Sequence, residues 1–129
     1  MKLRIKGDSL RFRITPSEMQ RLVDAGRIDE TVHFAAEAKL TYALEQGNAA
    51  ELTLRYTPGE VAVVLPAAQA RRWAQSDEVG IYGTADLPTG VVELKVEKDW
   101  ACLDKNDKSD KRDPRDEDAF PNPNEGVTC

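Results

Sequence analysis

The stretch that decides the fold is KLRIKGDSLRFRI, at residues 2–14. Apolar and basic residues alternate on both sides of its central Gly-Asp pair, a pattern that predicts two strands joined by a tight two-residue hairpin. That register makes one face of the hairpin apolar and the other basic. The predicted cross-strand pairs are Leu3–Phe12 and Ile5–Leu10 on the apolar face, and Lys2–Arg13 and Arg4–Arg11 on the basic face.

The segment after this hairpin carries the signals of a helix start. Thr15 is a capping residue, Pro16 suits the first helical position, and Glu18 completes a capping box. Gly26 predicts a left-handed stop. A second hairpin is expected over residues 32–44.

The same order of elements is then predicted again. A hairpin is expected over residues 52–65, a helix from Pro66, and two strands near residues 79–81 and 92–96. We therefore expect an α+β fold. Two ββαββ units would form a mainly antiparallel, curved or barrel-like sheet with two helices outside, which would also remove exposed sheet edges.

The domain organisation follows a change in composition near residue 104. Residues 1–103 are expected to form a single duplicated ββαββ domain. Residues 104–129 read as an acidic polar tail, in which aspartate recurs at every third position from Asp104 to Asp116. Such a segment offers little apolar surface to bury, although Phe120 provides a ring that would dock on the domain.

Composition excludes several classes of protein. The 129-residue chain carries a net charge of −5, which argues against a general nucleic-acid binder. The longest apolar run, residues 61–68, is far shorter than a membrane span. Two cysteines make no disulfide framework, so reduced thiols and a cytoplasmic protein are expected. The oligomeric state stays open.

Catalytic signatures are absent from the sequence. His33 is the single histidine, and in a strand it would point to the polar face without an orienting partner. Neither a nucleophile elbow nor a nucleotide-binding glycine loop occurs. Structural zinc takes four Cys or His ligands, more than the one histidine and two cysteines present. We therefore expect no metal and no cofactor.

The basic face of the first hairpin is the first candidate site. Like charges directly opposite each other in a ladder are unfavourable, so Arg4, Arg11 and Arg13 are candidates for binding an anion. The structural alternative is internal neutralisation, because the last strand carries Glu93 and Glu97 on its polar face.

A thiol is the second candidate site. Cys102 follows Lys98 at the end of the last strand, and a neighbouring ammonium lowers the pKa of a thiol and makes it nucleophilic. The structural alternative is a buried, inert cysteine, since Trp100 and Leu103 surround it.

Two motifs near the C-terminus resemble a known pattern. The stretch EKDWACL at residues 97–103, followed by DAFPNP at residues 118–123, is similar to the C-terminal pattern of a small bacterial family of uncharacterised proteins. Members of that family also open with a strand and hairpin like residues 1–14, and carry phenylalanine more often where Trp100 stands. The resemblance implies a bacterial cytosolic protein and brings no activity or functional residues.

The sequence thus favours a non-enzymatic binding module, for a protein partner or a small anionic ligand, over an enzyme. The alternative is an enzyme or binder of a phosphorylated small molecule, with Arg4, Arg11, Arg13, Glu93 and Glu97 lining a barrel interior. A weaker alternative is a thiol redox or metal site at Cys102. The direction in which the apolar face of the hairpin points distinguishes the binding module from the barrel with a charged interior. If apolar side chains fill the barrel, no charged interior remains.

Overall fold

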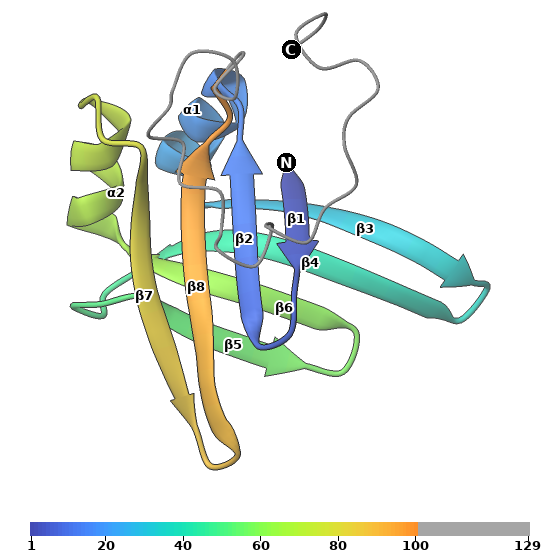
Figure 1. The fold of residues 1–129 in the computed structure, drawn as a ribbon. Coiled ribbons are helices and arrows are strands. Elements are labelled where there is room, and N and C mark those ends of the chain that lie inside the picture. The colour runs from blue at the N-terminus through green and yellow to red at the C-terminus, as the bar shows by residue number, and fades with distance from the viewer. Residues whose placement is uncertain (101–129) are drawn as a thin grey trace, which may run out of the picture. The chain divides into compact units, whose positions relative to one another are not determined.

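A computed structural model describes residues 1–100 of the chain, in which the element order strand–strand–helix–strand–strand occurs twice (Figure 1). The two helices and eight strands of this part are β1 (Lys2–Ile5), β2 (Ser9–Ile14), α1 (Pro16–Ala25), β3 (Arg27–Ala35), β4 (Ala38–Gly47), β5 (Thr53–Thr57), β6 (Glu60–Pro66), α2 (Ala67–Ala74), β7 (Gly80–Leu87) and β8 (Gly90–Lys98).

The strands form two separate four-stranded sheets. Sheet A has the order β1-β2-β8-β7, and sheet B has the order β3-β4-β6-β5. The central pairs β2–β8 and β4–β6 are parallel, whereas the hairpin pairs are antiparallel. Each sheet therefore combines a hairpin from the first ββαββ unit, residues 2–47, with one from the second unit, residues 53–98.

This topology confirms the α+β class, but the expected closure into a barrel is wrong. The central strands of each sheet use both of their edges, one in a hairpin and one in the parallel pairing. The outer strands β1, β7, β3 and β5 then remain as sheet edges, so neither sheet closes.

The predicted register of the first hairpin is confirmed. Leu3 pairs with Phe12, and Arg4 pairs with Arg11. Gly7 in the turn has φ 54°, the left-handed conformation that this kind of hairpin requires and that glycine adopts without steric cost.

The helix α1 begins and ends as predicted. The Thr15 side chain accepts from the backbone N–H of Glu18, and the Glu18 carboxylate accepts from the Thr15 N–H at 2.9 Å. Gly26, with φ 82°, ends the helix. Burial alone would raise the pKa of Glu18, but hydrogen bonds from the Met1 amine and Thr15 outweigh it and lower the pKa.

The core lies between the two sheets, which face each other in Figure 1, and both helices pack at one end of it. Phe12 on β2 and Leu44 on β4 are completely buried, as is Trp73 on α2. The rings of Phe12 and Tyr42 lie 6.5 Å apart across the two sheets. Together these contacts make one continuous apolar cluster.

Met1–Asp99 form one compact unit. The boundary expected at residues 103–104, the acidic tail and the docking of Phe120 all lie outside the described residues. Within the described part, neither helix has the length and apolar character needed to cross a bilayer.

Candidate anion-binding face

The basic side chains of the first hairpin point away from the core. The apolar residues of β2 are buried, and Arg11 and Arg13 alternate with them on the outer face of sheet A. Arg4 lies opposite Arg11 on the same face. The hypothesis of a charged barrel interior is therefore wrong, because apolar side chains fill the space between two open sheets.

The parallel pairing of β2 with β8 adds a cation that sequence reasoning missed. Arg11 lies opposite Arg4 on one side and opposite Lys95 on the other, so one row across three adjacent strands holds three cations. Tyr82 on β7 ends this row. Since neighbouring strands lie about 4.8 Å apart, the charges are close together. We call this row, Arg4–Arg11–Lys95, the cation row.

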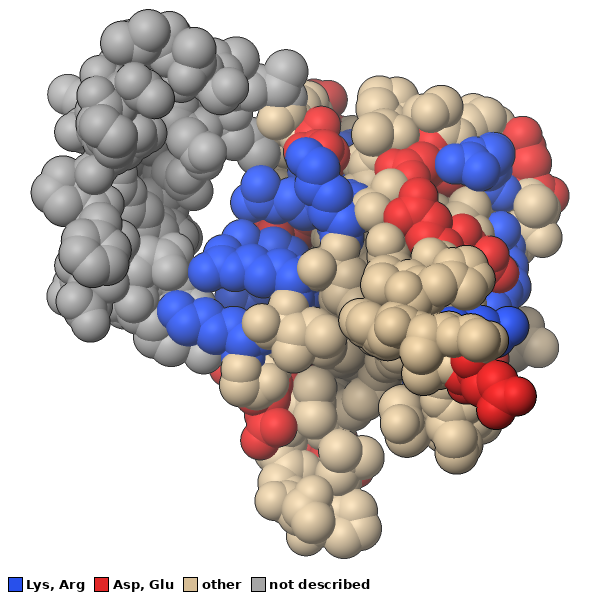
Figure 2. Space-filling model, turned by 90° about the vertical axis from the view of Figure 1, so that its right-hand side faces the viewer, with Lys and Arg blue, Asp and Glu red and all other residues tan. Residues whose placement is uncertain are grey.

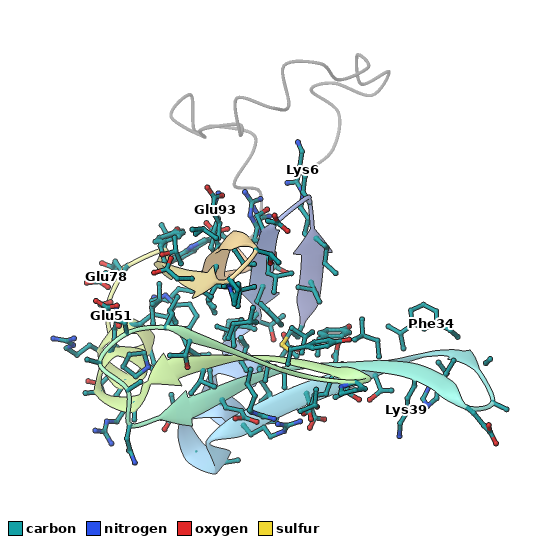
Figure 3. The ribbon with its side chains drawn as sticks, turned by 90° about the horizontal axis from the view of Figure 1, so that it is seen from below. Lys6, Phe34, Lys39, Glu51, Glu78 and Glu93 are labelled. Carbon is teal, nitrogen blue, oxygen red and sulfur yellow. The ribbon has the colours of Figure 1, made fainter. Side chains whose placement is uncertain are left out.

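The charge of sheet A changes sign across its strands. The outer charged positions on β1 and β2 are all basic, whereas those on β8 alternate in sign as Glu93, Lys95 and Glu97. In Figure 2 one group of Lys and Arg side chains lies together on the left of the described part, while other Lys and Arg side chains lie among Asp and Glu on the right. Lys6 and Glu93 project outward from sheet A in Figure 3. The basic face comprises Lys2, Arg4, Lys6, Arg11, Arg13 and Lys95.

Glu97 is the carboxylate that neutralises part of the basic face. Its Oε1 forms ion pairs with the Nε atoms of Arg11 at 3.1 Å and of Arg13 at 4.0 Å. Its Oε2 accepts a hydrogen bond from the Tyr82 hydroxyl at 2.9 Å. Burial and then this hydrogen bond raise the pKa of Tyr82 to about 12.

Internal neutralisation, the structural alternative, therefore applies to part of the face. Lys2 at the start of β1 also pairs with Asp99, at 3.3 Å. Around Lys95, by contrast, no carboxylate of residues 1–100 lies within 4.0 Å. Glu93, the other acid considered from sequence, lies opposite Ser9 at the turn end of the sheet.

The outer face of sheet B provides a comparison, because its charges form a balanced network. Arg27 on β3 donates to Asp29 at 2.9 Å and also to Glu45 and Glu60. Arg55 on β5 donates to Glu45 and lies 3.8 Å from Glu60. The hydrogen bond from Arg27 is the main cause that lowers the pKa of Glu60. Each arginine of this network thus meets carboxylates.

The row of sheet B that corresponds to the cation row has a different composition. In place of Arg11 and Lys95, its two central strands carry Ala62 and Ala43, which are completely buried. The flanking positions are Asp29 and Arg55. The same topology is therefore built without a row of cations, and we take the basic face of sheet A as the candidate site.

The remaining candidate residues do not form a site in the described part of the chain. The Lys98 ammonium donates to the Ser76 carbonyl oxygen, and Cys102 lies outside the described residues. His33 is exposed on β3, opposite Lys39. Residues 1–100 contain no cluster of three or more His, Cys, Asp or Glu side chains arranged to hold a metal ion.

Comparison with known proteins bears on the family that the C-terminal motifs resemble. No curated protein and no solved structure matches the chain. One family model matches residues 1–124, and it describes a family of unknown function, in agreement with the expected family of uncharacterised proteins. The bacterial source of that family and the two C-terminal motifs as its signature stay predictions. The chain belongs to the family of unknown function DUF7009.

Proposed function

We propose that this protein is a non-enzymatic interaction module that binds an acidic polypeptide on the basic face of sheet A. The observation that carries the proposal is the cation row, in which Arg11 stands between Arg4 and Lys95. Like charges opposite each other destabilise a sheet. An anionic partner that binds over the cations would offset their mutual repulsion. The outer positions of β1, Lys2 and Arg4, are both basic and continue the row toward the edge of sheet A.

The comparison between the two sheets supports this proposal. We infer that the two ββαββ halves are a duplication, since the pairing order of sheet A repeats in sheet B. In that case Ala62 and Ala43 are the counterparts of Arg11 and Lys95. A row of cations is thus a property of one face and not a requirement of the fold.

The shape of the face favours a polypeptide over a small molecule. Small-molecule sites are concave and enclose most of the ligand. Within residues 1–100 the basic face is the outer surface of sheet A, and the groove lined by Thr31 and Thr41 belongs to sheet B. The net charge of −5 argues against nucleic acid as the partner.

The test is a titration of the full chain into a fluorescein-labelled hepta-aspartate peptide at low and at high salt, followed by fluorescence anisotropy. We expect binding that weakens as salt rises. The double variant Arg4→Gln/Lys95→Gln should lose about tenfold in affinity, since each of two charges contributes about 0.7 kcal/mol at the surface. The matched control Lys39→Gln/Arg72→Gln removes two exposed cations elsewhere and should bind normally.

Two outcomes contradict the proposal. One is the absence of salt-sensitive binding to the wild-type chain. The other is an equal loss of affinity in both double variants, because that result would mean that net charge alone, and not the basic face, attracts the peptide.

A further inference from the structure

The strand β1 leaves main-chain groups on an open edge of sheet A. Lys6 and Ser9 exchange both backbone hydrogen bonds, each at 3.1 Å. Because bonded and non-bonded pairs alternate along an antiparallel ladder, Arg4 directs its N–H and C=O groups toward β2. Leu3 and Ile5 then direct theirs toward the edge, where no further strand of residues 1–100 lies beside β1.

An apolar surface lies beside this edge. The β3–β4 hairpin extends past β1 (Figure 1), and Figure 3 shows Phe34 on the side of that hairpin where β1 lies, with Lys39 on the opposite side. Val32 has the same parity as the buried Ile28 and so faces the same way. Phe34 is 69% exposed, Ile5 59% and Val32 40%. We call Ile5, Val32 and Phe34 the apolar shelf.

From these features we infer that the β1 edge receives an extended polypeptide as a fifth strand of sheet A. This inference rests on the proposed function, and it names how the acidic partner binds. An added strand would pair with the edge groups of Leu3 and Ile5. Its inward side chains would cover the apolar shelf, and its outward side chains would lie beside Arg4. The partner is therefore a segment in which acidic and apolar residues alternate.

The two edges of sheet B fit such a segment less well. On β3 the outward Asp29 would repel it, and the inward Glu30, which accepts from the Tyr42 hydroxyl at 2.8 Å, blocks an apolar side chain. On β5 the outward Arg55 lies beside the carboxylates of Glu45 and Glu60, which would repel an acidic segment. A second copy of this chain paired through β1 would bring basic strands together, so an acidic partner fits better.

The test compares two labelled seven-residue peptides with the full chain. One peptide alternates Asp and Val; the other has the same composition with all its Asp residues before its Val residues. We expect the alternating peptide to bind about tenfold more tightly, because only it offers strand pairing and apolar contact together. Hydrogen exchange measured by NMR should slow at the amides of Leu3 and Ile5, which gain partners, and change little at Arg4.

Variants of the shelf separate this inference from simple attraction of charge. Ile5→Ser and Phe34→Ser should each remove most of the tenfold preference for the alternating peptide. The matched controls are Tyr56→Ser and Leu87→Ser. Tyr56 holds the position on β5 that Ile5 holds on β1, and Leu87 is an exposed apolar residue of the β7–β8 hairpin.

Several results would overturn the inference. Equal affinity for both peptides, with no protection of Leu3 and Ile5, would leave charge attraction and the proposed function standing without strand addition. Loss of the preference in the Tyr56 variant alone would place the strand at β5. Dimerisation of the chain that Ile5→Ser abolishes would make a second copy the occupant. Failure of both peptides to bind even at low salt would remove the proposed function as well.

Discussion

Replacing Glu97 with glutamine is expected to weaken the fold and strengthen binding at the same time. The substitution keeps the shape of the side chain but removes the charge that Arg11 and Arg13 share. It also changes the acceptor of the Tyr82 hydroxyl from a carboxylate to an amide oxygen. The basic face then loses the negative charge with which Glu97 neutralises Arg11 and Arg13.

The size of the effect follows from how exposed these groups are. The Glu97 side chain is 15% exposed and that of Arg11 21%, so their ion pair lies between a surface pair and a buried one. Surface pairs contribute about 0.2–1 kcal/mol, and hydrogen bonds to charged groups about 1.5–3 kcal/mol. Because glutamine still accepts from Tyr82, we expect a loss of about 1–2 kcal/mol in the free energy of unfolding. For a domain of this size each 1 kcal/mol lowers the Tm by about 4–8 °C.

Three measurements check this prediction. Urea unfolding at low and at high salt should show a penalty that shrinks as salt rises. An absorbance titration of the tyrosines, with Tyr82→Phe to assign the signal, should move the pKa of Tyr82 from about 12 toward its ordinary value. The affinity for hepta-aspartate should rise several-fold, since the face becomes more basic.

The reasoning is wrong if Glu97→Gln leaves stability unchanged or weakens peptide binding. Glu60→Gln is the matched control on sheet B, where the carboxylate also contacts two arginines. It should lower stability without changing the affinity for the peptide. A gain in affinity in both variants would mean that the total charge, and not the basic face, sets the binding.

Two further predictions concern the scaffold. Glu18→Gln should lower the free energy of unfolding by up to about 1 kcal/mol, since it removes an acidic cap at a helix N-terminus. Because the pKa of Glu18 is lowered in the folded state, its contribution to stability is full above the unfolded pKa and is lost as pH falls through the folded pKa. The difference in urea stability between wild type and variant should therefore shrink as the solution is made acidic, and a constant difference at all pH values would argue against this. Gly80→Ala should cost about 1–3 kcal/mol by overpacking, because the new Cβ would lie 2.5 Å from the Val96 carbonyl oxygen. The control Gly90→Ala adds a Cβ in open space but at φ 145°, so a loss in Gly80→Ala no larger than in this control would contradict the steric argument.

Local features of the fold were predictable because their causes lie within a few residues. The hairpin register follows from the two-residue turn and the alternation around it, and Arg4–Arg11 is the pair it predicts. The start of α1 follows from Thr15 and Glu18, which satisfy each other's backbone donors. In both cases the energy that selects the structure comes from neighbours in sequence.

The association of the hairpins was not predictable in the same way. The parallel pairs β2–β8 and β4–β6 join strands with no turn between them, so no local signal encodes their register. The position of Lys95 beside Arg11 depends wholly on that pairing. The alternation along β8 indicates which face of the strand Lys95 occupies, but it carries no information on which residue lies opposite. The apolar shelf likewise depends on how far the β3–β4 hairpin extends past β1.

The pairing of β2 with β8 also decides when the proposed binding surface forms during synthesis. The chain leaves the ribosome from its N-terminus, so sheet B has all four of its strands long before β8 emerges. Until then the first hairpin has its basic side chains but no central partner strand, and Lys95 is not yet in place. The cation row is therefore assembled only by the last strand of the domain. A nascent or truncated chain without β8 would lack the complete basic face, so binding of the proposed acidic partner would require the finished fold.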